Sequence, residues 1–406
     1  MLNILYIGPN DSEWAQEHCP CSLAAAKWSR GFLTALSKVT ALTALTHTYY
    51  YPWPKGNLLW SSRDDRLYPT GWACEVVEYP VFRYIREWWW GIAYASKAKR
   101  IIREKKIDIV LMYNCYETWQ LSVLHAMKKV YPKIKVIPII LDGDDPRKDD
   151  WGWIKRAAVY SDAFIALSWW IYQNIPSKTD KPAYHFDGGA DGWRGKEPLG
   201  HQSLEESGTE DKRQAANGKF GGNYTLVHTG ALDQWRGLGF MLDVVKSLTA
   251  SRRDVKFIFC GKSSEKRLKE IFGNNSQVEL PGFVSEEEMV RICNSADVLL
   301  NVRDPNHPDN ILNYPSKLPH YLSFGRPIVS TKLESLSPDY QEVVNFPGED
   351  SVDSYIVKLE EVLGWSDAQK EVEYRKIKDW FESRKSWDVM VDKLSAWLNE
   401  FVKITA

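Results

Sequence analysis

The sequence lacks a long apolar run, a surplus of one charge and cysteines at the spacing of a metal site or a usual redox motif. No apolar run reaches the ~20 residues that a membrane-spanning helix needs, so we expect a protein that is soluble or lies on a membrane surface. The 52 Lys and Arg nearly balance the 53 Asp and Glu, which argues against nucleic acid as a partner. The six cysteines show no metal-ligand spacing, and Cys19-Pro20-Cys21 is too close for a usual redox motif. We therefore expect reduced thiols and a cytoplasmic location.

Length and hydrophobic pattern indicate a chain of two α/β halves. With 406 residues the chain exceeds one ordinary core, and the length predicts roughly two or three domains. Residues 1–9 lack the basic flank and the length of a signal segment, so we expect a first strand there. Apolar strands alternate with helical periods in both halves, which predicts parallel sheets covered on both faces. The expected strands include 3–7, 39–45, 107–112, 135–141 and 255–260, and the expected helices include 22–36, 82–105, 118–131 and 371–401.

The most informative stretch is Tyr314-Pro315-Ser316-Lys317-Leu318, followed by Tyr321 and by Gly325-Arg326-Pro327. It comes after a buried strand at 296–302 and opens a helix predicted over 316–323. Free backbone N–H groups at a helix start attract anions, and the Lys317 ammonium adds a point charge. The stretch therefore predicts a phosphate site. The structural alternative is an ordinary crossover helix with a solvated Lys317.

This stretch resembles the donor-binding segment of retaining glycosyltransferases of the GT-B fold, in particular family 4 (glycosyl transferases group 1). Its members often contain Pro-Ser-Lys-Leu, an acid, Tyr, and then Gly-Lys/Arg-Pro-Val. Three further segments, which precede this stretch, occur in the order that the family has: a strand and loop at 226–238, a strand ending at Gly261-Lys262, and a loop at 280–284. The resemblance implies an α/β fold of two Rossmann-like doubly wound domains facing a central cleft. It also implies a nucleotide-diphosphate sugar as donor, retention at the anomeric carbon, and no required metal or other cofactor.

The resemblance also assigns residues to the donor site, with Arg236 and Lys317 as catalytic cations. Ala231 stands where the family often has an arginine, so the phosphate clamp would consist of Arg236, Ser316 and Lys317. The donor-site residues that we expect are Gly230, Arg236, Lys262, Phe283, Asn313, Ser316, Lys317 and His320.

One departure from the family concerns its usual pair of glutamates, which contact the donor sugar and the ribose. Leu312 and His320 stand at these positions. A neutral His320 can hydrogen-bond a ribose hydroxyl, whereas Leu312 cannot make the sugar contact. Asn310 and Asn313 are the candidates to replace it.

A change in composition divides the chain. Residues 187–222 are polar and charged with few large apolar side chains, which is typical of a linker or flexible loop. We predict an acceptor-side domain at 1–187, a linker at 188–222 and a nucleotide-sugar domain at 223–380. By resemblance, a final helix at 381–406 crosses back to the first domain.

Two segments of the first half carry candidate acceptor-side residues. Asp142 and Asp144 follow a buried strand, and the carboxyl end of such a strand lies at the ligand crevice. By resemblance we expect one of them to meet the acceptor hydroxyl or the donor sugar. A metal-binding Asp-x-Asp motif and a turn or capping role are the alternatives. Asn10 and Trp14 lie in the first loop, where they either contact ligands or shape the turn.

The distribution of aromatic residues suggests the class of acceptor. Fourteen of the 19 tryptophans lie at or before Trp193, and tryptophan suits both sugar rings and lipid interfaces. The segment from Phe82 to Lys106 combines Trp88-Trp89-Trp90 with many basic residues. It is either a membrane face touching anionic lipid or an amphipathic helix packed on the sheet. We expect a glycan or lipid-linked acceptor and peripheral contact with the inner face of the membrane.

These patterns predict a glycosyltransferase of polysaccharide biosynthesis. Two other classes stay open: a sugar-nucleotide hydrolase or epimerase, and a non-catalytic nucleotide- or glycan-binding protein of the same fold. The missing glutamates keep the last class open.

Overall fold

The computed structural model describes residues 1–11, 19, 22–56, 59–61, 71–82, 84–141, 151–196, 224–232, 237–261, 265–304, 307 and 309–405. The chain separates into two compact units, each with its own parallel sheet. The first unit comprises Met1–Ala190, Ile311–Tyr314 and Lys385–Ala406, and the second comprises Asp191–Asn310 and Pro315–Arg384.

The first unit contains a seven-stranded sheet in the order β3-β2-β1-β4-β5-β6-β7, in which all neighbours are parallel. The order reverses beside β1, as in a Rossmann fold. Its strands are β1 (Asn3–Ile7), β2 (Ala41–Thr46), β3 (Ala73–Val76), β4 (Ile109–Tyr113), β5 (Lys135–Ile140), β6 (Phe164–Ala166) and β7 (Ala183–His185). Its helices are α2 (Leu23–Val39), α3 (Ile85–Lys105), α4 (Thr118–Val130), α5 (Gly152–Ala158), α6 (Trp169–Thr179) and α15 (Trp387–Thr405).

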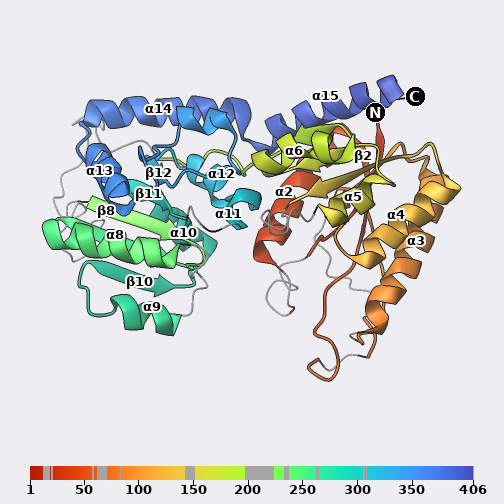
Figure 1. Cartoon of the computed structure of the whole chain (residues 1–406), viewed down its shortest axis with the longest axis horizontal. Helices are drawn as coiled ribbons and strands as arrows, with labels where there is room; N and C mark the ends of the chain where they lie inside the picture. The colour runs from red at the N-terminus through yellow and green to blue at the C-terminus, as the bar shows by residue number, and fades with distance from the viewer. Residues whose placement is uncertain are drawn as a thin grey trace. The chain divides into compact units, whose positions relative to one another are not determined.

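Strand β1 shows why both faces of this sheet are buried. Successive side chains of a strand point to opposite faces. Leu5 and Ile7 join the apolar cluster that includes residues of α3 and α4. Tyr6 points the other way, where its hydroxyl lies 3.2 Å from Ser29 Oγ of α2. Helix α2 also packs against α15, so the sheet lies between two helical layers (Figure 1).

The second unit repeats this plan with five parallel strands in the order β10-β9-β8-β11-β12. Leu226 of β8 packs with Met241 and Tyr355 on the face that α8 and α13 cover. Its strands are β8 (Tyr224–Thr229), β9 (Val255–Cys260), β10 (Val278–Gly282), β11 (Val298–Asn301) and β12 (Ile328–Ser330). Its helices are α8 (Leu238–Ser251), α9 (Glu265–Phe272), α10 (Glu286–Asn294), α11 (Asp309–Leu312, which ends in the first unit), α12 (Lys317–Leu322), the 3-10 turn η2 (Pro338–Glu342), α13 (Val352–Leu363) and α14 (Asp367–Arg384).

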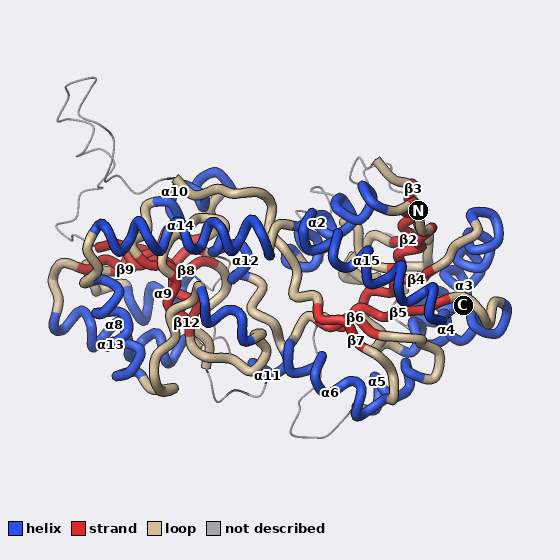
Figure 2. The backbone as a smooth tube through the Cα atoms, turned by 90° about the horizontal axis from the view of Figure 1, so that it is seen from above, coloured by secondary structure: helices blue, strands red, loops and turns tan. Residues whose placement is uncertain are grey.

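The two sheets confirm the prediction of an α/β fold with two Rossmann-like domains. The tail expected to be helical over 371–401 consists of two helices, α14 and α15, which are separated at Lys385 and Ser386 (Figure 2). Ser386 Oγ accepts the Val389 N–H at 3.4 Å, as an N-cap residue does, and so starts a new helix. The preceding Lys385 turns inward and pairs with buried Asp187 at 2.6 Å.

Candidate functional site

The candidate donor site lies at the carboxyl edge of the second sheet, where β8, β9 and β10 end. Gly230 donates its N–H to the Cys260 carbonyl at 2.7 Å, and Gly261 donates to the Gly282 carbonyl at 2.9 Å. Gly261 has a φ of +151°, and a Cβ there would lie 2.5 Å from the Gly230 carbonyl oxygen. Only glycine fits such an approach. The glycines thus bring the strand ends together at the edge where open α/β sheets bind ligands.

Helix α12 brings Lys317 to this edge. Lys317 Nζ lies 2.9 Å from Nε2 of His228, a residue of β8. Gly230 leaves room for the lysine stem, since a Cβ there would lie 3.0 Å from Lys317 Cε. One turn later, the Tyr321 hydroxyl accepts the Thr229 N–H at 2.7 Å. Two residues on one face of α12 therefore fix this helix to the end of β8.

The His228 imidazole is buried and its hydrogen-bond partners define its protonation. Nδ1 lies 3.1 Å from the Leu300 carbonyl. A carbonyl oxygen only accepts, so Nδ1 carries the proton and Nε2 accepts from the Lys317 ammonium. Burial and, next, the positive charge of Lys317 hold the pKa of His228 well below its usual value. The neutral ring orients the ammonium without cancelling its charge.

Sequence reasoning identified Lys317 but missed His228. The one available signal was a lone histidine in the otherwise apolar end of a strand, directly before Thr229-Gly230. A buried histidine of this kind is also typical of simple packing, so its pairing with Lys317 was visible only in the structure.

Three more predicted donor-site residues lie in the same unit. Ser316 is exposed at the start of α12, and its hydroxyl makes no capping hydrogen bond. Phe283 follows β10 and is 66% exposed. His320 is half-buried and packs edge-on against Phe324 at 5.1 Å. The other predicted donor residue with a described position, Asn313, belongs to the first unit.

Five predicted site residues lie outside the described part of the chain: Trp14, Asp142, Asp144, Arg236 and Lys262. Their roles stay predictions. Among the residues that the structure does describe, no group of three or more His, Cys, Asp or Glu side chains is placed to hold a metal ion.

The structure gives a reason for the leucine at position 312. Leu312 is 3% exposed and belongs to the apolar cluster of the first unit. The neighbouring Ile311 carbonyl accepts the Ser168 hydroxyl at 3.2 Å. Asn310, one candidate to replace the missing glutamate, is buried in the second unit and donates to the Asp304 carbonyl at 2.5 Å. Leu312 therefore packs in the core of the first unit, and the Asn310 amide stabilises the loop around Asp304.

The carboxyl edge of the first sheet gathers Asn10, which the sequence singled out, with polar groups that it did not. Asn10 is buried and donates to Cys74 Sγ at 3.6 Å, and burial raises the pKa of the next residue, Asp11, to about 6. His47 follows β2 and contacts the Tyr94 hydroxyl at 2.6 Å, and burial lowers its pKa to about 3. Arg86 is 8% exposed and its guanidinium lies over the rings of Tyr49 and Trp90. These rings pack around the buried Arg86 cation beside the apolar cluster of the first unit, where Trp90 is only 2% exposed.

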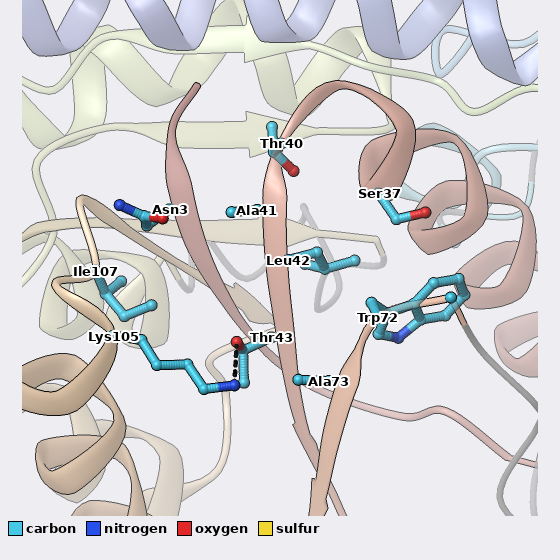
Figure 3. Close-up of a pocket in the computed structure, with 11 residues that line it drawn as sticks. Asn3, Ser37, Thr40, Ala41, Leu42, Thr43, Trp72, Ala73, Lys105 and Ile107 are labelled. Carbon is cyan, nitrogen blue, oxygen red and sulfur yellow. Dashed lines mark hydrogen bonds between the residues drawn. The ribbon is translucent and has the colours of Figure 1, made fainter.

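A hollow of about 310 Å³ lies at the opposite edge of the first sheet (Figure 3). It is lined by Asn3, Ala41 and Ala73, which begin β1, β2 and β3, and by Lys105, which donates to Thr43 Oγ1 at 3.2 Å. Ligands of doubly wound sheets bind at the carboxyl ends of strands. We therefore do not assign the hollow to the reaction.

The basic residues of α3 mostly serve the fold. Lys97 donates to the Val76 carbonyl at 2.8 Å, and Arg100 pairs with Glu75 and Glu104. The first turn, by contrast, exposes Tyr84 and Trp88. Membrane contact stays a prediction for this segment. Within the described residues, no helix has the length and apolarity to cross a bilayer.

Comparison with known proteins identifies the fold. The chain resembles a glycosyltransferase from Rickettsia africae over 99% of both chains, with 12% identity and a TM-score of 0.64. It resembles the catalytic domain of starch synthase IV from Arabidopsis thaliana, bound to ADP and acarbose, over 100% and 99% of the two chains, with 12% identity and a TM-score of 0.63. It also resembles HepE of Anabaena in complex with UDP and glucose, over 98% of this chain and 100% of the HepE chain, with 13% identity and a TM-score of 0.61. A sequence comparison with curated proteins finds no match.

Fold and sequence together indicate the class: the chain has the GT-B fold of glycosyltransferase structures, and its second half matches a glycosyltransferase family. Residues 223–365 match the sequence model of the family described as glycosyl transferases group 1. The match spans the strands and helices that present Lys317, His228 and Gly230. The predicted resemblance is thereby confirmed.

Proposed function

We propose that the protein transfers a glycosyl group from a nucleotide-diphosphate sugar to a hydroxyl of a glycan or lipid-linked acceptor. The reaction proceeds with retention and needs no metal. The observation that carries the proposal is the Lys317 ammonium, held 2.9 Å from a neutral imidazole at the carboxyl edge of the second sheet. The family match over the same residues supports a nucleotide-sugar donor.

Lys317 acts on the charge that develops as the sugar leaves the diphosphate. A preorganised cation at that position lowers the barrier, because the leaving group gains negative charge in the transition state. The exposed Ser316 hydroxyl supplies a further hydrogen bond to a phosphate oxygen, and Arg236 supplies the second cation. The loop around Phe283 faces the base, and His320 contacts the ribose. Asn313 takes part in the sugar contact in place of a glutamate, and Lys262 joins the phosphate clamp.

The acceptor binds on the first unit. Asn10 at the end of β1 has a described position at the carboxyl edge, and Trp14, Asp142 and Asp144 complete this part of the proposal.

The first experiment measures thermal stabilisation by UDP, GDP and ADP. A ligand that binds only the folded protein raises the unfolding midpoint, by about 2.7 kcal/mol of stabilisation at 100 times its Kd. We expect a shift with one nucleotide that Lys317→Ala reduces strongly. The matched control is Lys246→Ala, which removes the same charge from the exposed face of α8 in the same unit. No shift with any nucleotide, or an equal shift in Lys317→Ala, contradicts the proposed donor site.

A second experiment uses the sugar donor of the nucleotide that binds, and it distinguishes a transferase from the hydrolase, the epimerase and the binding protein. Product formation only with an added acceptor supports a transferase. Donor hydrolysis or epimer formation without acceptor supports the hydrolase or epimerase, and binding without turnover supports the binding protein.

A further inference from the structure

The contact between His228 and Lys317 has a consequence for catalysis. We infer that His228 is a positioning residue, which holds the Lys317 ammonium in the place where it meets the leaving diphosphate. This inference rests on the proposed function, because it assigns a role in the same donor site. His228 itself acts only through Lys317.

The geometry gives His228 one defined arrangement. The Leu300 carbonyl accepts from Nδ1 at 3.1 Å, and Nε2 then has a lone pair for Lys317 at 2.9 Å. Leu300 belongs to β11, the strand beside β8. Both ring nitrogens thus have a partner, and the Ala231 backbone makes a further hydrogen bond to the ring, so the ring cannot rotate without losing these contacts. The strand pair β8–β11 therefore fixes the position of the ammonium of α12.

A neutral acceptor suits this task better than an acid. A carboxylate at position 228 would also hold Lys317, but it would cancel the positive charge that the diphosphate requires. Lysine has four rotatable bonds, so an unheld ammonium would spend most of its time elsewhere, and fixing it in advance removes that entropic cost from the reaction. The bond to His228 occupies one of the three ammonium donors.

If His228 served packing alone, a different set of substitutions would be tolerated at this position. A histidine that only fills space would be replaceable by any side chain of similar size that satisfies Leu300. A positioning residue requires an acceptor at the place of Nε2. The two roles separate with two amides, because the glutamine side chain reaches the place of Nε2 whereas asparagine reaches only that of Nδ1.

The experiment compares His228→Gln with His228→Asn in the full-length protein. We measure the affinity for UDP, GDP and ADP, and kcat and KM with the sugar donor of the nucleotide that binds. We expect His228→Asn to lower kcat by roughly 10- to 100-fold, the cost of a misplaced catalytic group. We expect His228→Gln to retain kcat within about threefold, because a neutral hydrogen bond to Lys317 is kept. Circular dichroism gives the folded fraction by which each kcat is corrected.

A double-mutant cycle makes the test independent of stability. If His228 acts through Lys317, then His228→Asn has little further effect on kcat in a Lys317→Ala background. Additive losses overturn the inference, as does an equal loss of kcat in the Gln and Asn variants. Wild-type kcat in His228→Asn, together with impaired Lys317→Ala, overturns the inference but leaves the proposed function intact. If Lys317→Ala itself binds and turns over donor normally, the proposed function fails.

Discussion

Gly230 links backbone conformation to the position of Lys317. Its φ of +90° is unfavourable for any residue with a side chain, and a Cβ would lie 3.0 Å from Lys317 Cε. We expect Gly230→Ala to cost about 1–3 kcal/mol of unfolding free energy and to weaken binding of the nucleoside diphosphate by displacing the lysine. Chemical denaturation and titration with UDP, GDP and ADP measure the two effects.

Gly239→Ala is the control for Gly230→Ala. It lies in the first turn of α8, where a Cβ would meet no atom within 4 Å. Alanine favours the helical conformation over glycine, so Gly239→Ala is expected to leave stability unchanged or to raise it by up to about 1 kcal/mol. Equal losses in the two variants would mean that the Gly230 effect does not arise from its conformation.

Individual residues differ in how far the sequence reveals their role. The sequence singled out Lys317, because it lies in a motif whose residue types match phosphate binding, and its role there stays a prediction. The partner of Lys317 was not predictable, because His228 is 89 residues away in the chain and only the sheet brings the two together. The role of Leu312 was likewise visible only in the structure. The sequence showed that a glutamate was missing, but only the apolar cluster of the first unit explains the leucine.

At the scale of elements, α15 begins beside a buried ion pair. Lys385 Nζ lies 2.6 Å from both Asp187 carboxylate oxygens, and the two side chains are 5% and 2% exposed. Lys385→Ala leaves a buried carboxylate without this partner, which is expected to cost about 3–5 kcal/mol. The fall in the thermal unfolding midpoint measures it.

The same helix offers an exposed ion pair for comparison. Lys38 and Asp388 pair at 2.7 Å with side chains 57% and 60% exposed. Lys38→Ala is expected to cost no more than about 1 kcal/mol, because solvent screens such a pair. If both variants lower the midpoint by the same amount, burial of the Asp187–Lys385 pair is not what stabilises the start of α15.

Elements were more predictable than their ends. The first strand was predicted at its observed bounds, since a buried parallel strand is a short continuous apolar run. The closing helix was predicted at 381–406, whereas α14 ends at Arg384 and α15 begins at Trp387, because helical periodicity continues on both sides of the break and does not mark its position. The pairing of Lys385 with Asp187, 198 residues apart, is what turns the chain at this point.

At the scale of the whole molecule, the sequence predicted two Rossmann-like domains because each half alternates strands and helices. It did not predict that residues 311–314 belong to the first unit although both flanking segments belong to the second. Four residues carry no periodic signal, and their assignment follows from the burial of Leu312 and the Ser168–Ile311 hydrogen bond.

The division into two units predicts where a nucleotide protects the backbone. If the donor site lies at the edge formed by Gly230, Gly261 and Lys317, then binding stabilises the second unit most. With ligand at 100 times its Kd, amides that exchange through opening of this unit are expected to exchange about 100-fold more slowly. Hydrogen exchange with mass spectrometry compares peptides from 224–232 and 317–322 with peptides from 41–50 of the first unit. The nucleoside without its diphosphate serves as the control ligand, and it should protect less if Lys317 holds the phosphates as proposed. Strongest protection in the first unit would place the nucleotide there and remove Lys317 from the donor site.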